Sequence, residues 1–255
     1  MRKILEKVTA KEISFEEAEK LLKANVIEKV GEIAQLDVLR QARTGIPEVI
    51  LAENKTIEIL LEIIQKFLEK NRFVIISRFN QEQKEVIVNT FESNSNYILK
   101  INSIAKIITI KSKDFKFPSF NGLVGLITAG SSDISVAEEA KEIILAMGCE
   151  VMSSYDVGIA GIHRIFKPLS EMTKKGVQVI IVCAGMEGTL PGVVAALVDV
   201  PVIGVPVSSG YGLGEKGKGA LTTMLQSCSP GLLVVNIDNG FGAGASAALI
   251  ANNAK

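Results

Sequence analysis

The chain has 255 residues, of which 47% are hydrophobic and 22% charged, and its 28 Lys and Arg residues balance its 28 Asp and Glu residues. A neutral chain offers no net field to attract nucleic acid or an anionic membrane, so we expect neither as a partner. The composition is that of a folded protein and excludes disorder. With no apolar run of membrane-spanning length and charge from Arg2 onward, a cytoplasmic location is expected.

The first half of the chain predicts a small α/β unit. Ser14, followed three residues later by Glu17, is typical of a capping box and predicts the start of a helix. A second helix is expected from about Lys55 to Lys70, where apolar residues form one stripe. Strand-like apolar runs follow, with a helical pattern between the first two, at Phe73–Ile76, Tyr97–Ile101 and Ile107–Ile110.

Two arginines lie between these helices. Arg40 and Arg43 are three residues apart on an expected helix and therefore share one face. They are candidates to bind a phosphate together. The alternative is that they belong to a solvated helix face, which is the commoner role of such charges.

The distribution of glycine marks a domain boundary. Before residue 121 the chain contains only Gly31 and Gly45, and all its other glycines lie between Gly122 and Gly244. The segment Lys111–Asn121 combines charge, a proline and small polar residues, as linkers do. We expect an N-terminal α/β domain over residues 1–117 and a nucleotide-binding catalytic domain over residues 118–255.

The second half predicts a parallel sheet with helices on both faces. Apolar, β-branched runs of strand length alternate there with helical stretches, at Leu123–Thr128, Glu150–Ser153, Val177–Val182, Val202–Val207 and Leu232–Ile237. Open sheets of this kind bind ligands outside the carboxyl ends of their strands. The segments that follow the strands are therefore the first places to look for function.

The segment after the first strand is suited to an anion. Gly130, Ser132 and Asp133 precede a helix, where backbone N–H groups point outward. Asp133 is also a candidate to hold a ribose hydroxyl or Mg²⁺. The alternative is that Ser132 or Asp133 merely caps the helix.

Carboxylates follow the second and third strands. Asp156 is better placed for function than His163, which we expect to be a packed or surface histidine within a helix. After the third strand, Glu187 stands in a glycine-rich turn where backbone and ligand can approach closely. Its neighbours Gly185, Met186 and Thr189 are candidate ligand contacts; the alternative is a plain turn with Glu187 solvated.

The segment after the fourth strand is glycine-rich. It contains Ser209, Tyr211 and Lys216, which are placed to cover a nucleotide and pair with its phosphates, although such loops also serve as plain connectors. Three cysteines, in no paired CxxC spacing, are expected as free thiols: Cys149, Cys183 and Cys228. Cys228 is expected at a helix C-terminus, which disfavours a thiolate, and at the end of the sheet away from the cleft.

Five motifs in order resemble the LarB family, the carboxylase-hydrolases that begin nickel-pincer nucleotide cofactor synthesis: TAGSSD, SYDVGIAGIHR, AGMEGTLPG, PVIGVPVSSGYG and LQSCSPGLLVVNIDNGFGAG. The same half is more distantly similar to PurE, an aminoimidazole ribonucleotide carboxylase, which implies a flavodoxin-like α/β fold. It departs from PurE at two points. Tyr155 and Asp156 replace a histidine-arginine pair, and Thr189 replaces the histidine before the LPG turn.

The LarB resemblance implies a reaction. Such enzymes carboxylate the pyridinium ring of nicotinic acid adenine dinucleotide and cleave its phosphoanhydride, giving pyridinium-3,5-biscarboxylic acid mononucleotide and AMP. Carbon dioxide or bicarbonate is the co-substrate. Mg²⁺ is expected as a cofactor, and an organic cofactor is not expected. The family's reactive cysteine matches Cys228, with Glu187 as the first candidate for the base and Asp156 as the second.

The resemblance also implies assembly and leaves alternatives open. A PurE-like homo-octamer with active sites shared between subunits would bring Cys228 to a neighbour's cleft. Ser132, Asp133, Lys216 and the Arg40/Arg43 pair are candidates to hold phosphates or Mg²⁺. The competing functions are a PurE-like carboxylase or mutase, and a non-catalytic nucleotide-binding regulator.

Overall fold

The computed structural model describes residues 2–24, 28–30, 34–36 and 40–254. The chain forms two compact units, one of Met1–Lys100 with Ile108–Phe115, the other of Ile101–Ile107 with Lys116–Lys255. In the described ranges, no helix has both the length and the apolar character needed to cross a membrane.

The first unit is built on a four-stranded sheet. Its strands run in the order β3 (Val49–Leu51), β4 (Phe73–Ser77), β6 (Ile107–Ser112) and β5 (Tyr97–Asn102), with β3 parallel to β4. The remaining elements are α1 (Arg2–Thr9), α2 (Phe15–Ala24), the antiparallel pair β1 (Glu28–Val30) and β2 (Ala34–Leu36), α3 (Arg40–Thr44), α4 (Ile57–Asn71) and α5 (Gln81–Phe91).

The helix after Ser14 and the helix near Lys55 are both confirmed. Glu17 N donates to Ser14 Oγ at 3.0 Å immediately before α2, as a capping residue does. The helix expected from Lys55 begins two residues later, at Ile57, because Thr56 has extended backbone and its side chain caps the first turn. Local capping chemistry therefore sets both helix starts.

The second unit confirms the predicted parallel sheet. Its five strands run in the order β11 (Leu232–Val234), β10 (Val202–Pro206), β9 (Val179–Ala184), β7 (Leu123–Thr128) and β8 (Glu150–Ser154), and every neighbouring pair is parallel. This is the flavodoxin-like order. The chain leaves β7 toward β8 on one side and returns to β9 on the other, so a crevice opens at the carboxyl ends of β7 and β9.

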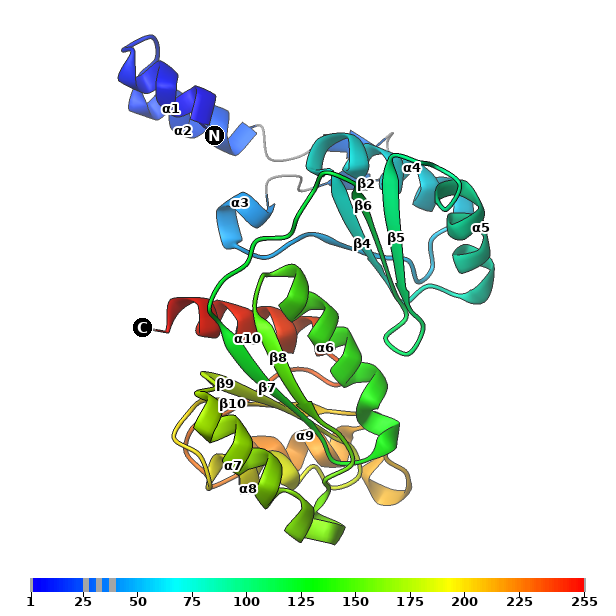
Figure 1. Ribbon diagram of the computed structural model, residues 1–255, viewed down its shortest axis with the longest axis vertical. Helices are drawn as coiled ribbons and strands as arrows, with labels where there is room; N and C mark the ends of the chain where they lie inside the picture. Colours follow the sequence, from blue (N-terminus) through cyan, green and yellow to red (C-terminus); the bar gives the residue numbers. More distant parts are fainter. Residues whose placement is uncertain (1, 25–27, 31–33, 37–39, 255) are drawn as a thin grey trace. The chain divides into compact units, whose positions relative to one another are not determined.

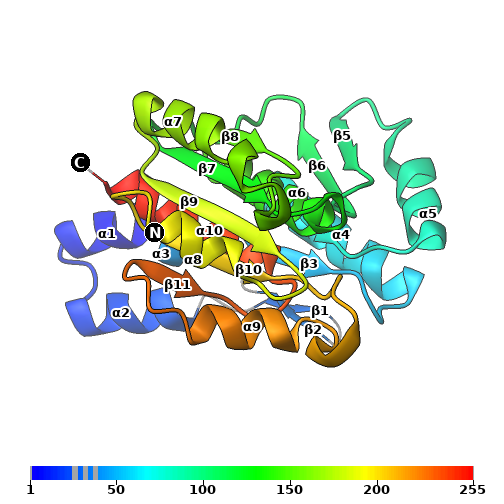
Figure 2. The same cartoon turned by 90° about the horizontal axis from the view of Figure 1, so that it is seen from below.

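Helices cover both faces of this sheet (Figures 1 and 2). One face carries α6 (Ile134–Ala146) and α10 (Gly240–Asn253). The other carries α7 (Phe166–Lys175), α8 (Leu190–Ala195) and α9 (Lys218–Leu225), whose apolar side chains join one core cluster with the strands. Short 3₁₀ helices at Ser131–Asp133, Ile159–Arg164 and Gly212–Gly214 follow β7, β8 and β10.

The glycines of the last motif have a packing role. A Cβ on Gly240 would lie 2.3 Å from Val136 O, and one on Gly244 would lie 2.5 Å from Ala140 O. These positions are one helical turn apart, so a strip without side chains lets α10 lie close against α6. The NGFGAG segment therefore serves helix packing.

Most strand boundaries differ from the prediction by one or two residues, and two differences matter most. The third strand, expected over Val177–Val182, is β9 and extends to Ala184, so that Cys183 lies inside the sheet and is fully buried. The fifth ends at Val234 instead of Ile237. His163 lies in a 3₁₀ helix and is exposed, in agreement with the surface alternative.

Candidate active site

A pocket of about 350 Å³ opens at the carboxyl ends of the central strands, and we call it the strand-tip pocket. Its walls come from the loops after β7, β8, β9 and β10, which are far apart in sequence. The structure brings together there most of the residues proposed from sequence: Ser132, Asp133, Asp156, Gly185, Met186, Glu187, Thr189, Ser209 and Tyr211.

Asp133 forms the floor of this pocket and is only 2% exposed. Its Oδ1 accepts a hydrogen bond from Ser209 Oγ at 2.8 Å, and its Oδ2 accepts one from Gly130 N at 2.9 Å. The side chain makes no capping bond to α6, but its bond with Gly130 N is a capping-box contact of the 3₁₀ helix Ser131–Asp133, so the capping alternative is met in part. Burial raises the pKa of this carboxyl, against the opposing effect of the Ser209 hydroxyl.

Gly185 makes the Ser209–Asp133 bond sterically possible. A Cβ at Gly185 would lie 2.1 Å from Ser209 Oγ and 3.2 Å from Asp133 Oδ1. The next residues turn sharply, with φ of +47° at Met186 and +65° at Gly188. Left-handed backbone at a non-glycine residue such as Met186 is strained and typical of functional turns. The exposed Glu187 lies between them on the wall of the pocket.

Asp156 and Arg164 form an ion pair on another wall. Arg164 Nη1 donates to Asp156 Oδ2 at 3.1 Å, and both side chains are partly exposed. The backbone of Asp156 has φ of +57°, and its N–H donates to the buried Thr128 Oγ1 at 3.0 Å. Arg164 was not among the residues proposed from the sequence; its position after a glycine-rich turn was the available signal.

Tyr155, which stands where PurE has histidine, has a different environment. Its hydroxyl donates to Glu138 on α6, and Tyr155 is not among the residues that line the strand-tip pocket. Burial is the main cause that raises the pKa of Tyr155, which keeps it a neutral donor. Asp156 is therefore the one of the two that faces the pocket.

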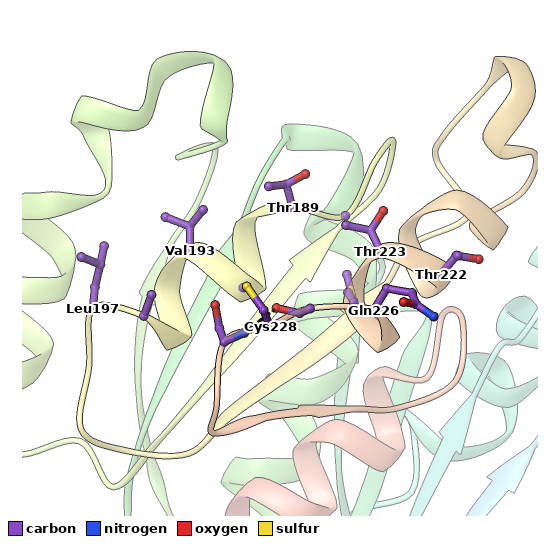
Figure 3. A pocket seen from close by; sticks show the side chains of 13 residues that line it. Thr189, Val193, Leu197, Thr222, Thr223, Gln226 and Cys228 are labelled. Atoms are coloured by element: carbon purple, nitrogen blue, oxygen red, sulfur yellow. Dashed lines mark hydrogen bonds between the residues drawn. The ribbon is translucent and has the colours of Figure 1, made fainter.

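Cys228 lines a second and larger pocket of about 650 Å³, which we call the cysteine pocket (Figure 3). Figure 3 shows the cysteine between Val193 of α8 and Thr223 of α9. Gly188 and Thr189 line both pockets, so the two adjoin at the start of α8. Cys228 itself is not among the residues that line the strand-tip pocket, so its expected place outside that cleft is retained.

Close packing explains this position. The loop that carries Cys228 lies against Gly192, the third residue of α8, where a Cβ would be only 2.8 Å from Ser227 Oγ. Because glycine leaves that space open, the loop after α9 runs alongside the first turn of α8. The cysteine pocket therefore lies between this loop, α8 and α9.

The three free cysteines differ in access. Cys228 is exposed, whereas Cys149 and Cys183 are buried. Burial, followed by the charge of Asp133, raises the pKa of Cys183 far above its usual range. Of the three thiols, Cys228 is the one that a ligand can reach.

The other predicted cations lie elsewhere. Arg40 and Arg43 belong to α3 of the first unit, where Arg40 Nη1 lies 3.0 Å from Glu48 Oε2. Lys216 is exposed and lines neither the strand-tip pocket nor the cysteine pocket. A phosphate-binding role for these three residues stays a prediction.

The described residues do not form a ready metal centre. Among them, no three His, Cys, Asp or Glu side chains are placed to hold a metal ion together. Each carboxylate oxygen of Asp133 already accepts a hydrogen bond, which reduces its capacity to bind Mg²⁺. The Mg²⁺ expectation stays a prediction without assigned ligands.

Comparison with known proteins covers both units. Residues 123–255 match the AIR carboxylase family, and residues 27–113 match the LarB/PurE-like N-terminal domain. An uncharacterized protein of Methanocaldococcus jannaschii is 48% identical over 240 residues, which are 94% of this chain and 92% of that protein. The N5-carboxyaminoimidazole ribonucleotide mutase of Pyrococcus horikoshii is 40% identical over 91 residues, 34% of this chain and 49% of the mutase.

Proposed function

This chain belongs to the LarB family, with a LarB/PurE-like N-terminal domain followed by an AIR carboxylase domain, and on that premise we propose its reaction. The substrate is nicotinic acid adenine dinucleotide. The enzyme carboxylates the pyridinium ring of this dinucleotide with carbon dioxide or bicarbonate and hydrolyses its phosphoanhydride. The products are pyridinium-3,5-biscarboxylic acid mononucleotide and AMP.

One observation carries this proposal. The accessible thiol of Cys228 lies in a pocket that adjoins, at Thr189, the pocket lined by Glu187. A dinucleotide has two parts joined by phosphates and suits two adjoining pockets. A PurE-type mononucleotide reaction gives no reason for a reactive cysteine in the adjoining pocket.

The thiol solves a chemical difficulty. A pyridinium ring is electron-poor and does not attack carbon dioxide. When the Cys228 thiolate adds to the ring carbon opposite nitrogen, the C–S bond forms and the ring becomes a dihydropyridine whose adjacent carbon is an enamine nucleophile. That carbon then bonds to carbon dioxide.

Release of the enzyme needs a base. The carboxylated carbon loses its proton, the electron pair re-forms the ring double bond, and the C–S bond breaks to return the thiolate. Glu187 is proposed as the base because it is exposed on the wall of the adjoining pocket. Asp156 is the second candidate, although in the structure its carboxylate is paired with Arg164.

A direct assay tests the reaction. The protein is incubated with nicotinic acid adenine dinucleotide, bicarbonate and Mg²⁺, with a chelator in a parallel sample. AMP and the dicarboxylated mononucleotide should both appear. Turnover of an aminoimidazole ribonucleotide in their place would establish the PurE-like alternative, and binding without turnover of either would favour a regulator.

Cys228→Ala tests the covalent step. This variant should form no dicarboxylated product, and intact-protein mass spectrometry should detect a substrate adduct on the wild type alone. The control is Cys183→Ala, since that thiol is fully buried. Carboxylation by Cys228→Ala would remove the covalent role.

Assembly is part of the proposal. We propose a PurE-like homo-octamer in which neighbouring subunits complete the walls of open pockets. Cys228 lines the cysteine pocket and not the strand-tip pocket of its own chain, and in the proposed assembly it serves a neighbouring subunit's cleft. Analytical ultracentrifugation should give the mass of eight chains, and a monomer would contradict this part.

A further inference from the structure

The charges of the strand-tip pocket are unbalanced. Its described lining contains three carboxylates, Asp133, Asp156 and Glu187, and a single cation, Arg164. A nucleotide phosphate that enters such a pocket is repelled by the carboxylates and needs a partner of opposite charge. Among these lining residues, only Arg164 supplies it.

Several contacts hold the Arg164 guanidinium in position. Its Nη1 donates to Asp156, and its Nε lies 3.4 Å from Gly161 O, a long contact. A Cβ at Gly161 would be 2.7 Å from Nε and 3.1 Å from Nη2. The absence of a side chain at Gly161 therefore leaves room for the guanidinium. A guanidinium has five N–H donors, so donors remain for a ligand.

The ion pair is a poor device for stability. Asp156 adopts a left-handed backbone, which is strained for a residue with a side chain, and the buried Thr128 helps to hold it there. A partly exposed ion pair returns little stability, generally less than such backbone strain costs. This imbalance points to a role in ligand binding.

We propose that Arg164 is the phosphate-binding residue of the strand-tip pocket, and that the phosphate of a bound nucleotide replaces Asp156 as its partner. Asp156 is a positioning residue that keeps the guanidinium in place while the pocket is empty. A phosphate can accept two parallel hydrogen bonds from the guanidinium, a stronger arrangement than the single Nη1–Oδ2 bond. The exchange also frees the Asp156 carboxylate. This inference deepens the proposed function and rests on it for the identity of the nucleotide.

The exchange predicts opposite effects for the two partners. Without the charge of Arg164, Arg164→Gln should bind AMP about 10- to 100-fold more weakly. Arg164→Lys should have an intermediate AMP affinity, because an ammonium keeps the charge but lacks the two parallel N–H donors of a guanidinium. Asp156→Asn should bind AMP more tightly than the wild type, since the competing carboxylate is gone.

Calorimetric titration with AMP, and with adenosine as the phosphate-free probe, measures these effects without any turnover. Lys167→Gln is the matched control, because Lys167 lies three residues further on, 4.0 Å from Glu171, and lines neither pocket. Its AMP affinity should equal that of the wild type. For Arg164→Gln, the preference for AMP over adenosine should largely disappear.

Three results would overturn the inference: wild-type AMP affinity in Arg164→Gln, weakened AMP binding in Asp156→Asn, or no preference for AMP over adenosine in the wild type. If the ion pair had only a structural role, Arg164→Gln and Asp156→Asn would both bind AMP more weakly than the wild type. The titration measures binding and not carboxylation, so its result does not depend on whether the proposed reaction occurs. AMP binding that depends on Arg164 without turnover of nicotinic acid adenine dinucleotide would keep the phosphate site and remove the reaction.

Discussion

Replacing Gly192 by alanine should misplace Cys228 while leaving the fold intact. The new Cβ would lie 2.8 Å from Ser227 Oγ, whereas ordinary van der Waals contact begins at 3.4 Å. Ser227 must therefore retreat by roughly 0.6 Å (3.4 − 2.8) or rotate its hydroxyl. Rotation would break its 3.3 Å hydrogen bond with Ser229 N. Either response moves the loop on which Cys228 stands.

The magnitude follows from two opposing effects. Overpacking costs about 1–3 kcal/mol, and alanine in place of a helical glycine recovers about 0.5–1 kcal/mol. The net loss of unfolding free energy should thus stay below roughly 2.5 kcal/mol, which a domain of this size tolerates. A misplacement of about 1 Å costs on the order of 100-fold in rate. A displacement of roughly 0.6 Å should therefore lower the rate of carboxylation about tenfold.

Two assays check this reasoning. Carboxylation is measured at saturating substrate, and the reaction of Cys228 with a maleimide reports the loop position independently of turnover. Adding Ser227→Ala to Gly192→Ala removes the close contact, since the next atom, Ser227 Cβ, is at 3.7 Å. The double variant should regain most of the lost rate. Unchanged carboxylation and maleimide reactivity in Gly192→Ala would refute the argument.

Three further predictions concern the strand-tip pocket. Gly185→Ala should break the Ser209–Asp133 bond, because its Cβ would lie 2.1 Å from Ser209 Oγ; urea unfolding should show a loss of about 1–3 kcal/mol, and wild-type stability would contradict it. Glu187→Gln should slow ring deprotonation, so that the Cys228 adduct accumulates in mass spectra; a wild-type rate would exclude Glu187 as the base. Burial raises the pKa of Asp133 above its usual 3.8, so its carboxyl favours folding when protonated, and this contribution is lost as pH rises through the raised pKa. Urea unfolding at several pH values should show that the unfolding free energy of the wild type, relative to that of Asp133→Asn, falls from about pH 4 upward. If the unfolding free energies of the two proteins changed with pH in the same way, the prediction would be contradicted.

The sequence was informative about the strand-tip pocket because its residues follow strands. Asp133, Asp156 and Glu187 each come shortly after a β-branched apolar run, and parallel strands bring their carboxyl ends to one edge. That argument needs only the strand pattern and the parallel topology. It therefore found the pocket from residues that are distant along the chain.

The strand pattern did not predict the packing of the Cys228 loop against α8, and it did not identify Arg164. Cys228 follows a helix, and topology alone assigns such a loop to the opposite edge of the sheet. Its actual position depends on Gly192 and Ser227, a contact between helix and loop that no periodicity encodes. Arg164 is linked to Asp156 across a 3₁₀ turn, which a pattern of apolar residues does not reveal.

The sequence by itself determined the parallel strands of the second half and the capped helix starts at Phe15 and near Ile57. These follow from local chemistry: apolar periodicity and side-chain caps. Only the tertiary structure decided that Ser209 meets Asp133 across 76 residues and that the loop of Cys228 packs against α8. Such contacts depend on side-chain volume where distant segments meet, and the missing side chains of Gly185 and Gly192 make them possible.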